Sequence, residues 1–224
     1  MPKAKLPNKE FEWTPELAYV IGLLVTDGCL SNDERHIIMR SSELPLLKTF
    51  KRCLNLSNRI TETFNNGWSK KRNYRIQFGD VQFYRWLLKI GLFPAKTYTI
   101  GKINVPNKYF SDFLRGHLDG DGSVWTYKDY WNTFKNPKYI YKRLWTKFIS
   151  ASETHIKWLR KKIINLLDVK GYFWEQKPWM PYQTTSVWEI RFAKKESIKL
   201  LSQLYYNKNV PCLVRKRKIA EKFI

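Results

Sequence analysis

VIGLLVTDG at residues 20–28 and LRGHLDGDG at residues 114–122 are two copies of one pattern. The first copy is largely apolar, and each copy has a small residue at its third and seventh positions and ends in Asp-Gly. Asp27 and Asp121 therefore occupy matching positions. The repetition places two carboxylates at the ends of two similar segments, and the expected fold and chemistry depend on this arrangement.

Each copy is predicted to form a helix. Pro15 and Glu16 are typical of a helix start, an apolar run follows, and Gly28 fits a left-handed C-cap. The small residues at the third and seventh positions lie four residues apart, so they share one helix face. Such a face lets two helix backbones approach closely, and we expect the two helices to pack against each other.

The two carboxylates are costly in this arrangement. A helix C-terminus carries about half a negative charge, which makes an Asp there unfavourable by roughly 0.3–1 kcal/mol. A hard divalent cation, which prefers oxygen ligands, would resolve the repulsion between two such ends. A single Asp-Gly pair is more often an ordinary solvated turn. Two copies in matching contexts favour a metal site at Asp27 and Asp121.

The two segments resemble the paired motifs of LAGLIDADG homing endonucleases, of the monomeric type with two motifs. In that family the eighth motif position carries the catalytic acid, which corresponds here to Asp27 and Asp121. The sixth position is often acidic as well. It is Asp119 in the second copy but Val25 in the first, a departure that leaves the catalytic position untouched.

The resemblance implies a metal-dependent nuclease. Mg2+ would be held by Asp27 and Asp121, with backbone carbonyls near Thr26 and Gly120 as further ligands, and Mn2+ or Ca2+ could substitute for binding. Members of the family cut the two strands of a duplex across one minor groove. We therefore expect hydrolysis of phosphodiesters in double-stranded DNA that leaves 3' overhangs.

The resemblance also implies a lysine near each metal. The region after the last helix of each half offers Lys96 in the first half and Lys216 in the second. A cation there can stabilise developing charge or orient water. The alternative for Lys216 is a basic final helix, residues 215–218, that only grips the DNA backbone.

The whole chain is predicted to be an internal duplication, with halves at residues 1–104 and 105–224. Each half shows the order helix, strand pair, helix, strand pair, helix. The expected fold is α+β: two pseudo-symmetric αββαββα halves that form a saddle of antiparallel sheets, with the motif helices packed at the centre. The matching segments are strands at 35–40 and 144–150, strands at 74–78 and 188–192, and helices at 81–90 and 196–204. Residues 126–143 have no counterpart and are expected to form an extended, aromatic and basic hairpin loop.

Polar positions on the predicted strands are candidates for DNA contact. Alternation places one apolar face on the helices and one polar face toward a groove. The side chains expected to contact DNA are Arg40, Lys70, Arg72, Arg75, Gln77, Lys147, Glu189 and Arg191. Arg75, Gln77 and Arg191 suit guanine or adenine edges, and Glu189 could accept from cytosine. Lys70 and Arg72 either grip phosphates or stay solvated, and Arg40 could contact a phosphate.

Composition agrees with a nucleic-acid partner. The formal net charge is +22 over 224 residues, and the excess is spread over both halves. This suits a long polyanion such as a DNA duplex with a pseudo-palindromic or asymmetric target. The three Cys and three His lack zinc-ligand spacing, which argues against zinc-finger, HNH and His-Cys-box sites. No apolar stretch reaches the ~20 residues of a membrane span, and no signal-peptide pattern is evident. We expect an intracellular monomer of bacterial, phage or organellar origin.

Three functions fit these features. The first is a site-specific double-strand DNA endonuclease, intron-encoded or freestanding. The second is an RNA maturase that assists intron splicing, because the family's fold serves that purpose in some introns. The third is a non-catalytic DNA-binding protein, which would more often have lost one of the two acids. The presence of both Asp27 and Asp121 favours the endonuclease.

Overall fold

The computed structural model describes residues 11–63, 72–178, 180 and 184–224. The first half contains α1 (Pro15–Thr26), β1 (Gly28–Leu30), β2 (His36–Ser41), α2 (Leu44–Cys53), β3 (Thr61–Thr63), β4 (Asn73–Gly79) and α3 (Val81–Lys89). The second contains α4 (Phe110–Asp119), β5 (Ser123–Asp129), β6 (Tyr141–Ser150), α5 (Glu153–Leu167), β7 (Tyr172–Gln176), β8 (Val187–Phe192), α6 (Lys194–Leu204) and α7 (Val214–Ala220). Short 3-10 helices lie at Lys96–Tyr98 and Asn107–Tyr109. The predicted α+β order αββαββα is confirmed in both halves, and the second half adds α7.

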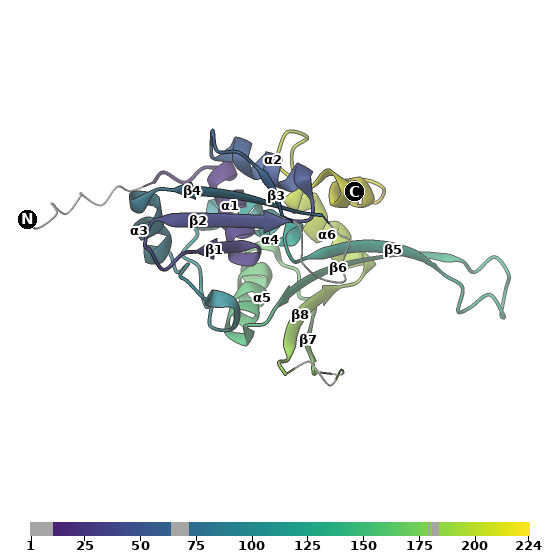
Figure 1. The fold of residues 1–224 in the computed structure, drawn as a ribbon. Helices are drawn as coiled ribbons and strands as arrows, with labels where there is room; N and C mark the ends of the chain where they lie inside the picture. Colours follow the sequence, from purple (N-terminus) through teal and green to yellow (C-terminus); the bar gives the residue numbers. More distant parts are fainter. Residues whose placement is uncertain (1–10, 64–71, 179, 181–183) are drawn as a thin grey trace, which may run out of the picture.

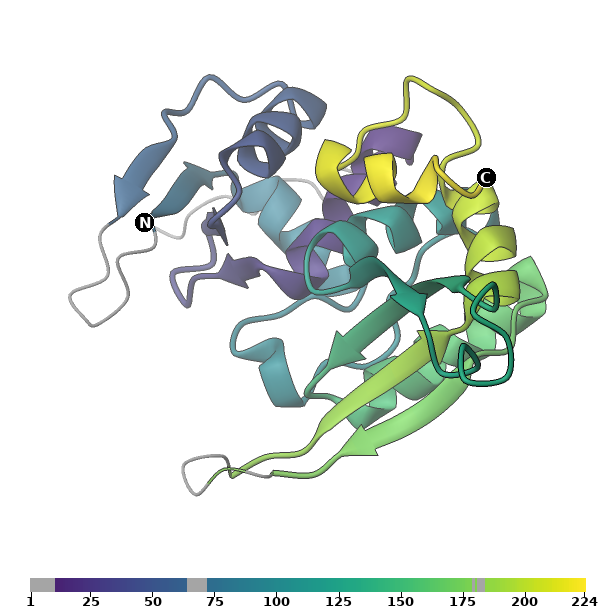
Figure 2. The ribbon, with the colours of Figure 1, turned by 90° about the vertical axis from the view of Figure 1, so that its right-hand side faces the viewer.

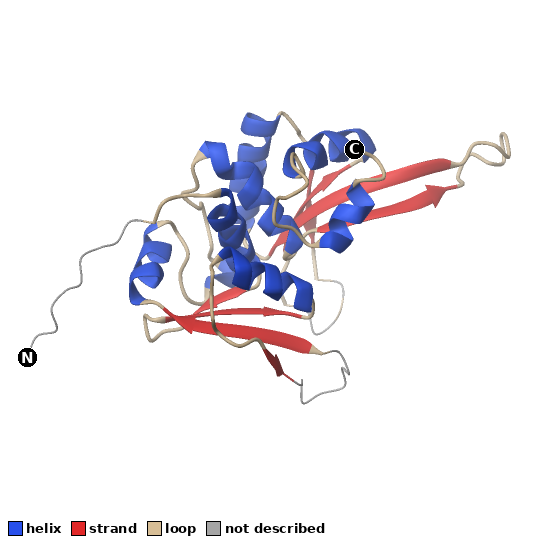
Figure 3. Ribbon diagram, turned by 90° about the horizontal axis from the view of Figure 1, so that it is seen from above, coloured by secondary structure: helices blue, strands red, loops and turns tan. Residues whose placement is uncertain are grey.

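The strands form two four-stranded antiparallel sheets with the same topology. The orders are β1-β2-β4-β3 and β5-β6-β8-β7, so each strand occupies the place of its counterpart in the other sheet. Figures 1 and 2 show the two sheets as separate layers, purple to blue and teal to green, and the helices gather on one side of them in Figure 3. All strands of each sheet come from one predicted half, while the boundary at residue 104 stays a prediction.

One face of each sheet packs on the helices. In the first sheet, the pairs Ile37–Phe78 and Met39–Ile76 contribute buried side chains to the core. The alternate pairs, Ile38–Gln77 and Arg40–Arg75, lie on the opposite face. The second sheet repeats the pattern: Phe148 and Ile190 are paired and buried, whereas Lys147 and Arg191 are paired on the other face. The alternation therefore gives each sheet an apolar face and a face that carries charge.

The motif helices α1 and α4 lie together at the centre of the molecule. Thr14 caps α1 by accepting a hydrogen bond from the Leu17 amide at 3.1 Å, as expected for a helix that starts at Pro15. A Cβ atom on Gly22 would lie 2.1 Å from the Phe113 carbonyl oxygen, and one on Gly116 would lie 2.0 Å from the Tyr19 carbonyl oxygen. The small residues therefore permit backbone contact, as predicted.

The prediction that Gly28 is a left-handed C-cap is wrong. Asp27 ends α1 in a right-handed conformation, with φ −97° and ψ −3°, and Gly28 begins β1 without a positive φ. The chain enters the strand directly, so no left-handed residue is required to reverse it. Glycine is needed at this place because a Cβ would lie 2.6 Å from the Leu24 Cα.

The extended hairpin predicted for residues 126–143 is present. Strands β5 and β6 pair continuously from Ser123–Lys147 to Asp129–Tyr141. The hairpin projects beyond the rest of the molecule (Figures 1 and 3).

Throughout the part of the chain that the structure describes, helices are too short or too polar to cross a membrane.

Candidate metal and DNA-binding site

The crossing of α1 and α4 brings the ends of the two motifs together. Asp27 is the C-cap of α1, and Asp121 lies two residues beyond the end of α4. A Cβ on Gly120 would lie 2.0 Å from the Thr26 hydroxyl oxygen and 2.7 Å from Oδ2 of Asp27. All four residues predicted for the metal site, Thr26, Asp27, Gly120 and Asp121, thus belong to one small region.

The pKa values of both carboxyls are raised in this region. The pKa of Asp27 is raised to about 7, first because the surrounding protein displaces water and second because the charge of Asp121 repels a second negative charge. The Thr26 hydroxyl, which donates to Asp27 Oδ2 at 3.3 Å, offsets part of this rise. Loss of hydration also raises the pKa of Asp121. Both groups would be relieved by a cation.

The donor set fits a hard divalent cation. Carboxylate and carbonyl oxygens are the ligands that Mg2+ and Ca2+ prefer, and Mg2+ is commonly held by one or two carboxylates together with water and substrate phosphates. Within the described residues, no group of three or more His, Cys, Asp or Glu could hold a metal ion. A metal at Asp27 and Asp121 would therefore need backbone oxygens, water or a DNA phosphate to complete its coordination.

The two predicted lysines lie in equivalent places. Lys96 donates to the carbonyl of Gly28, and Lys216 donates to the carbonyl of Gly122 at 2.7 Å; these are the ninth residues of the two motifs. Both side chains are buried, which lowers their pKa values, in the case of Lys216 to about 8. The nearby carboxylates favour the charged form and limit the decrease.

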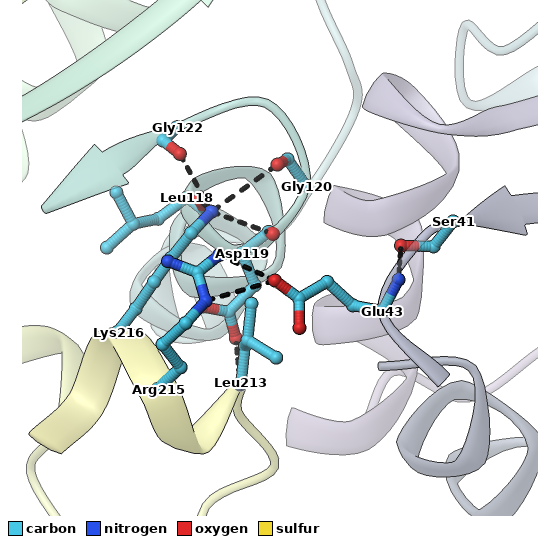
Figure 4. A network of polar contacts seen from close by, with 9 residues as sticks. All are labelled: Ser41, Glu43, Leu118, Asp119, Gly120, Gly122, Leu213, Arg215 and Lys216. Atoms are coloured by element: carbon cyan, nitrogen blue, oxygen red, sulfur yellow. Dashed lines mark hydrogen bonds and ion pairs between the residues drawn. The ribbon is translucent and has the colours of Figure 1, made fainter. Parts of the chain in front are cut away.

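Lys216 also closes the end of the second motif helix. Its ammonium group lies 2.6 Å from the Leu118 carbonyl oxygen, 2.8 Å from that of Asp119 and 3.4 Å from that of Gly120 (Figure 4). Carbonyls at a helix end lack partners within the helix, and a lysine from α7 satisfies them here. The Gly120 carbonyl, predicted as a metal ligand, therefore already lies within weak hydrogen-bonding distance of the Lys216 ammonium group.

An open cavity of about 630 Å3 adjoins this region. Asp27, Gly120 and Lys216 line it, together with Arg40 from the predicted DNA-contacting set. A second cavity, of about 470 Å3, is lined by Gly120 and Lys216 and also by Lys147. A larger cavity of about 830 Å3, between α2 and residues 208–221, contains neither motif carboxylate, so volume alone does not locate the site.

Glu43 and Arg215 were not among the predicted site residues, although both line the cavity beside Asp27. Arg215 donates through Nε and Nη2 to Oε1 of Glu43, at 3.0 and 2.8 Å (Figure 4). The pair joins α2 of the first half to α7 of the second. No sequence signal identifies it, because the partners are 172 positions apart.

Asp119, the acid at the sixth motif position, has a structural role. Its Oδ2 accepts from the Tyr19 hydroxyl at 2.9 Å and from the Leu213 amide at 2.6 Å. It thereby ties α1 and the start of α7 to α4. Burial raises the pKa of Asp119 to about 6, although Lys216 and these hydrogen bonds lower it in part. The corresponding Val25 is a buried apolar residue.

The DNA-contact candidates of the first sheet lie on its open face. Arg40 and Arg75 are cross-strand neighbours, and Arg75 donates through Nη2 to Gln77. Like charges directly opposite each other are unfavourable without an anion. Arg72 is largely exposed, with its Nε 3.3 Å from a Glu62 carboxylate oxygen. Lys70 lies outside the described residues.

The second sheet differs from the prediction at Glu189. This side chain is 0% exposed, and its two oxygens are held by Lys147 Nζ at 2.9 Å and Arg191 Nε at 2.6 Å. Glu189 is therefore not presented as an acceptor for cytosine. It is a buried counter-ion, and it fixes Lys147 and Arg191 on the open face, where they lie opposite each other.

The sequence matches no protein-family model and no curated protein. Solved structures do match. The homing endonuclease I-WcaI bound to its DNA recognition sequence aligns with a TM-score of 0.56 at 13% identity, over 97% of this chain and 95% of that one. I-DmoI in complex with DNA and Ca aligns with a TM-score of 0.55 at 14% identity, over 92% and 97%.

Full-length DUF199/WhiA from Thermatoga maritima aligns with a TM-score of 0.53 at 16% identity, over 96% of this chain. The chain spans 63% of the length of that protein. Identities this low establish the fold alone. The resemblance first seen in the two nine-residue motifs is confirmed at that level, and the chain has the LAGLIDADG fold.

Proposed function

We propose that this protein is a site-specific, divalent-metal-dependent endonuclease that cuts double-stranded DNA. One observation carries the proposal: the contact between α1 and α4 brings Asp27 and Asp121 together in a buried place, where loss of hydration and then the charge of Asp121 raise the pKa of Asp27 to about 7. Two adjacent acids at two helix ends do not stabilise a protein unless a cation binds between them. Perturbed groups of this kind are typical of functional sites.

The residues that would hold Mg2+, or Mn2+ or Ca2+ in its place, are Asp27 and Asp121, with the backbone oxygens of Thr26 and Gly120. A bound divalent ion would neutralise charge on the scissile phosphate and lower the pKa of water. Burial disfavours the ionised form of both carboxylates, and the nearby charges of Lys96 and Lys216 offset part of that effect. The same two cations would stabilise negative charge that develops on the phosphate.

The open faces of the two sheets would carry the duplex. Each face holds two cations on neighbouring strands, Arg40 with Arg75 and Lys147 with Arg191; Glu189 offsets one charge of the second pair, whereas Arg40 and Arg75 repel each other. Phosphates relieve such repulsion, and Arg75 and Gln77 have the chemistry to read purine edges. Lys70 and Arg72 would contact phosphates. A monomer with two matching halves suits a long pseudo-palindromic or asymmetric target, cut across the minor groove to leave 3' overhangs.

The test is selection of cleaved duplexes from a randomised library in Mg2+, followed by assays on the selected site. We expect the wild type to cut both strands and a chelator to abolish cleavage. Asp27→Asn and Asp121→Asn should each abolish double-strand cleavage while DNA binding persists. Asp33→Asn, which removes an exposed carboxylate outside the site, is the matched control and should cut normally.

Binding of DNA without cleavage is the second candidate. It is suggested by the likeness to DUF199/WhiA, whose N-terminal LAGLIDADG domain shows that this fold is not confined to homing endonucleases. A library that yields bound but uncut duplexes would establish that candidate and contradict the nuclease. Undiminished cleavage by both Asn variants would contradict the role of the two motif acids. An RNA maturase would instead bind intron RNA and cut no duplex.

A further inference from the structure

The tip of the β5–β6 hairpin, residues 130–140, exposes large aromatic side chains. Trp131 is 80% exposed and Phe134 is 74% exposed. Further large hydrophobic side chains exposed on the hairpin are Tyr127, Tyr130, Tyr139, Ile140 and Tyr141. Exposed apolar groups gathered on one projecting element mark an interaction surface.

The charge on the hairpin identifies the chemistry of the partner. Residues 126–143 contain five Lys or Arg and a single acid, Asp129. That acid is neutralised by Arg143, with Nη2 2.7 Å from Oδ2. Lys135 lies beside an aromatic ring, with its Nζ 5.5 Å from the centroid of Phe134. Cations interleaved with exposed rings fit a strand of phosphates and bases.

The hairpin holds its tip away from the body in a defined geometry. The paired strands extend as far as Asp129–Tyr141, and the Thr126 hydroxyl donates to the Arg143 carbonyl at 2.6 Å. One pair before the tip end of the strands, Lys142 Nζ lies 4.7 Å from the ring centroid of Phe223. Within the tip, the Trp131 amide donates to Asp129 Oδ1 at 2.9 Å. The aromatic residues are therefore presented by a ribbon that is already folded.

We infer that this tip is a second nucleic-acid site, which binds unpaired nucleotides by stacking bases on Trp131 and Phe134. Lys135 and Lys138 would contact the phosphates. A duplex offers no free base faces, and inserting a side chain into it requires unstacking, whereas unpaired bases stack on aromatic rings without that cost. Both single-stranded DNA and RNA loops supply this chemistry. The inference does not rest on cleavage by the motif carboxylates.

The test is fluorescence anisotropy of the full-length protein with labelled strands of about 15 nucleotides, as DNA and as RNA, and with the matching duplex. Trp131→Ala combined with Phe134→Ala should weaken single-strand binding by about tenfold or more, and duplex binding far less. Trp131→Phe combined with Phe134→Tyr preserves the rings and should retain binding. All four changes lie at solvent-exposed positions, so thermal unfolding checks that the fold is intact.

Salt dependence tests the two lysines. Each of Lys135→Gln and Lys138→Gln should reduce the slope of log K against log salt by about 0.7 for a single strand. Tighter binding of the DNA or the RNA strand would identify which source of unpaired bases the tip prefers. Equal single-strand affinity of the double Ala variant and the wild type would overturn the inference. An equal loss for duplex and single strand would also overturn it and assign the tip to flanking duplex.

Discussion

Gly22 and Gly116 face each other where the two motif helices cross, and neither position has room for a side chain. A Cβ on Gly22 would lie 2.9 Å from the Cα of Gly116 and 2.1 Å from the Phe113 carbonyl oxygen. These neighbours are backbone atoms of a buried helix, so they cannot rotate away as a flexible side chain could. A methyl group at either glycine would push the helices apart, so the distance between Asp27 and Asp121 depends on glycine at both positions.

Gly22→Ala and Gly116→Ala should therefore each destabilise the protein by about 1–3 kcal/mol or more, because the helices must separate. Chemical denaturation measures the change. Gly101→Ala is the matched control, since its Cβ would meet nothing closer than a Thr154 methyl at 3.8 Å. Equal effects of the three substitutions would show that helix contact is not the limiting feature.

Lys216→Met should destabilise the protein by ~2–4 kcal/mol, because the carbonyls of Leu118, Asp119 and Gly122 lose their buried donor. The exposed lysine of the same helix provides the comparison, and Lys218→Met should change the free energy of unfolding by no more than ~0.5 kcal/mol. Both values come from denaturant unfolding. A Lys216→Met protein as stable as the Lys218→Met protein would mean that Lys216 does not hold the motif turn.

Lys147→Gln and Arg191→Gln should each reduce the salt-dependence slope of duplex binding by about 0.9, because each variant neutralises one phosphate fewer. Binding titrations between low and moderate salt measure it. Glu189→Gln should act on stability instead, with a loss of ~1–3 kcal/mol, because Lys147 and Arg191 lose their charged hydrogen-bond partner but remain partly exposed to water. Slopes that do not change in either cation variant would remove this face from the DNA-binding surface.

The buried pair His117–His155 predicts loss of stability in acid. Their Nε2 atoms lie 3.2 Å apart, and burial lowers both pKa values, that of His155 to about 4. Between pH 6.5 and 4 the unfolded chain binds more protons than the folded one, so stability is lost as pH falls. The loss from His155 should be about 2 kcal/mol at pH 5.

His117→Phe isolates the contribution of the pair, because it removes one titrating group among aromatic neighbours. Lys96 and Lys216, the nearby cations that further disfavour protonation of the pair, stay in place. Unfolding measured from pH 4.5 to 7.5 should show a shallower decline in the variant than in the wild type. Parallel profiles would exclude the pair as an acid-sensitive element.

Much of the fold could be predicted because local sequence patterns determine it. The duplicated motif, the strand alternation at 74–78 and 188–192 and the hairpin at 126–143 each depend on neighbouring residues. The wrong prediction of a left-handed cap at Gly28 also came from a local pattern. An Asp-Gly helix end suggests a left-handed cap, but the next strand starts immediately, and the contact with Leu24 decides the residue.

The site could be predicted only in part. Repetition singled out the two acids, and the resemblance to LAGLIDADG homing endonucleases indicated Lys96 and Lys216. The pairing of Glu43 with Arg215 and the burial of Glu189 depend on contacts between distant parts of the chain. No pattern within one strand distinguishes an acid that reads a base from one that holds two cations beneath the surface.

The central claim is that Asp27 and Asp121 jointly hold divalent metal against a duplex. Anomalous scattering from crystals grown with DNA and Mn2+ measures this most directly. The account predicts a manganese peak within coordination distance of a carboxylate oxygen of Asp27 or Asp121, with DNA phosphate beside it. Ordered DNA with no such peak at either carboxylate would contradict it.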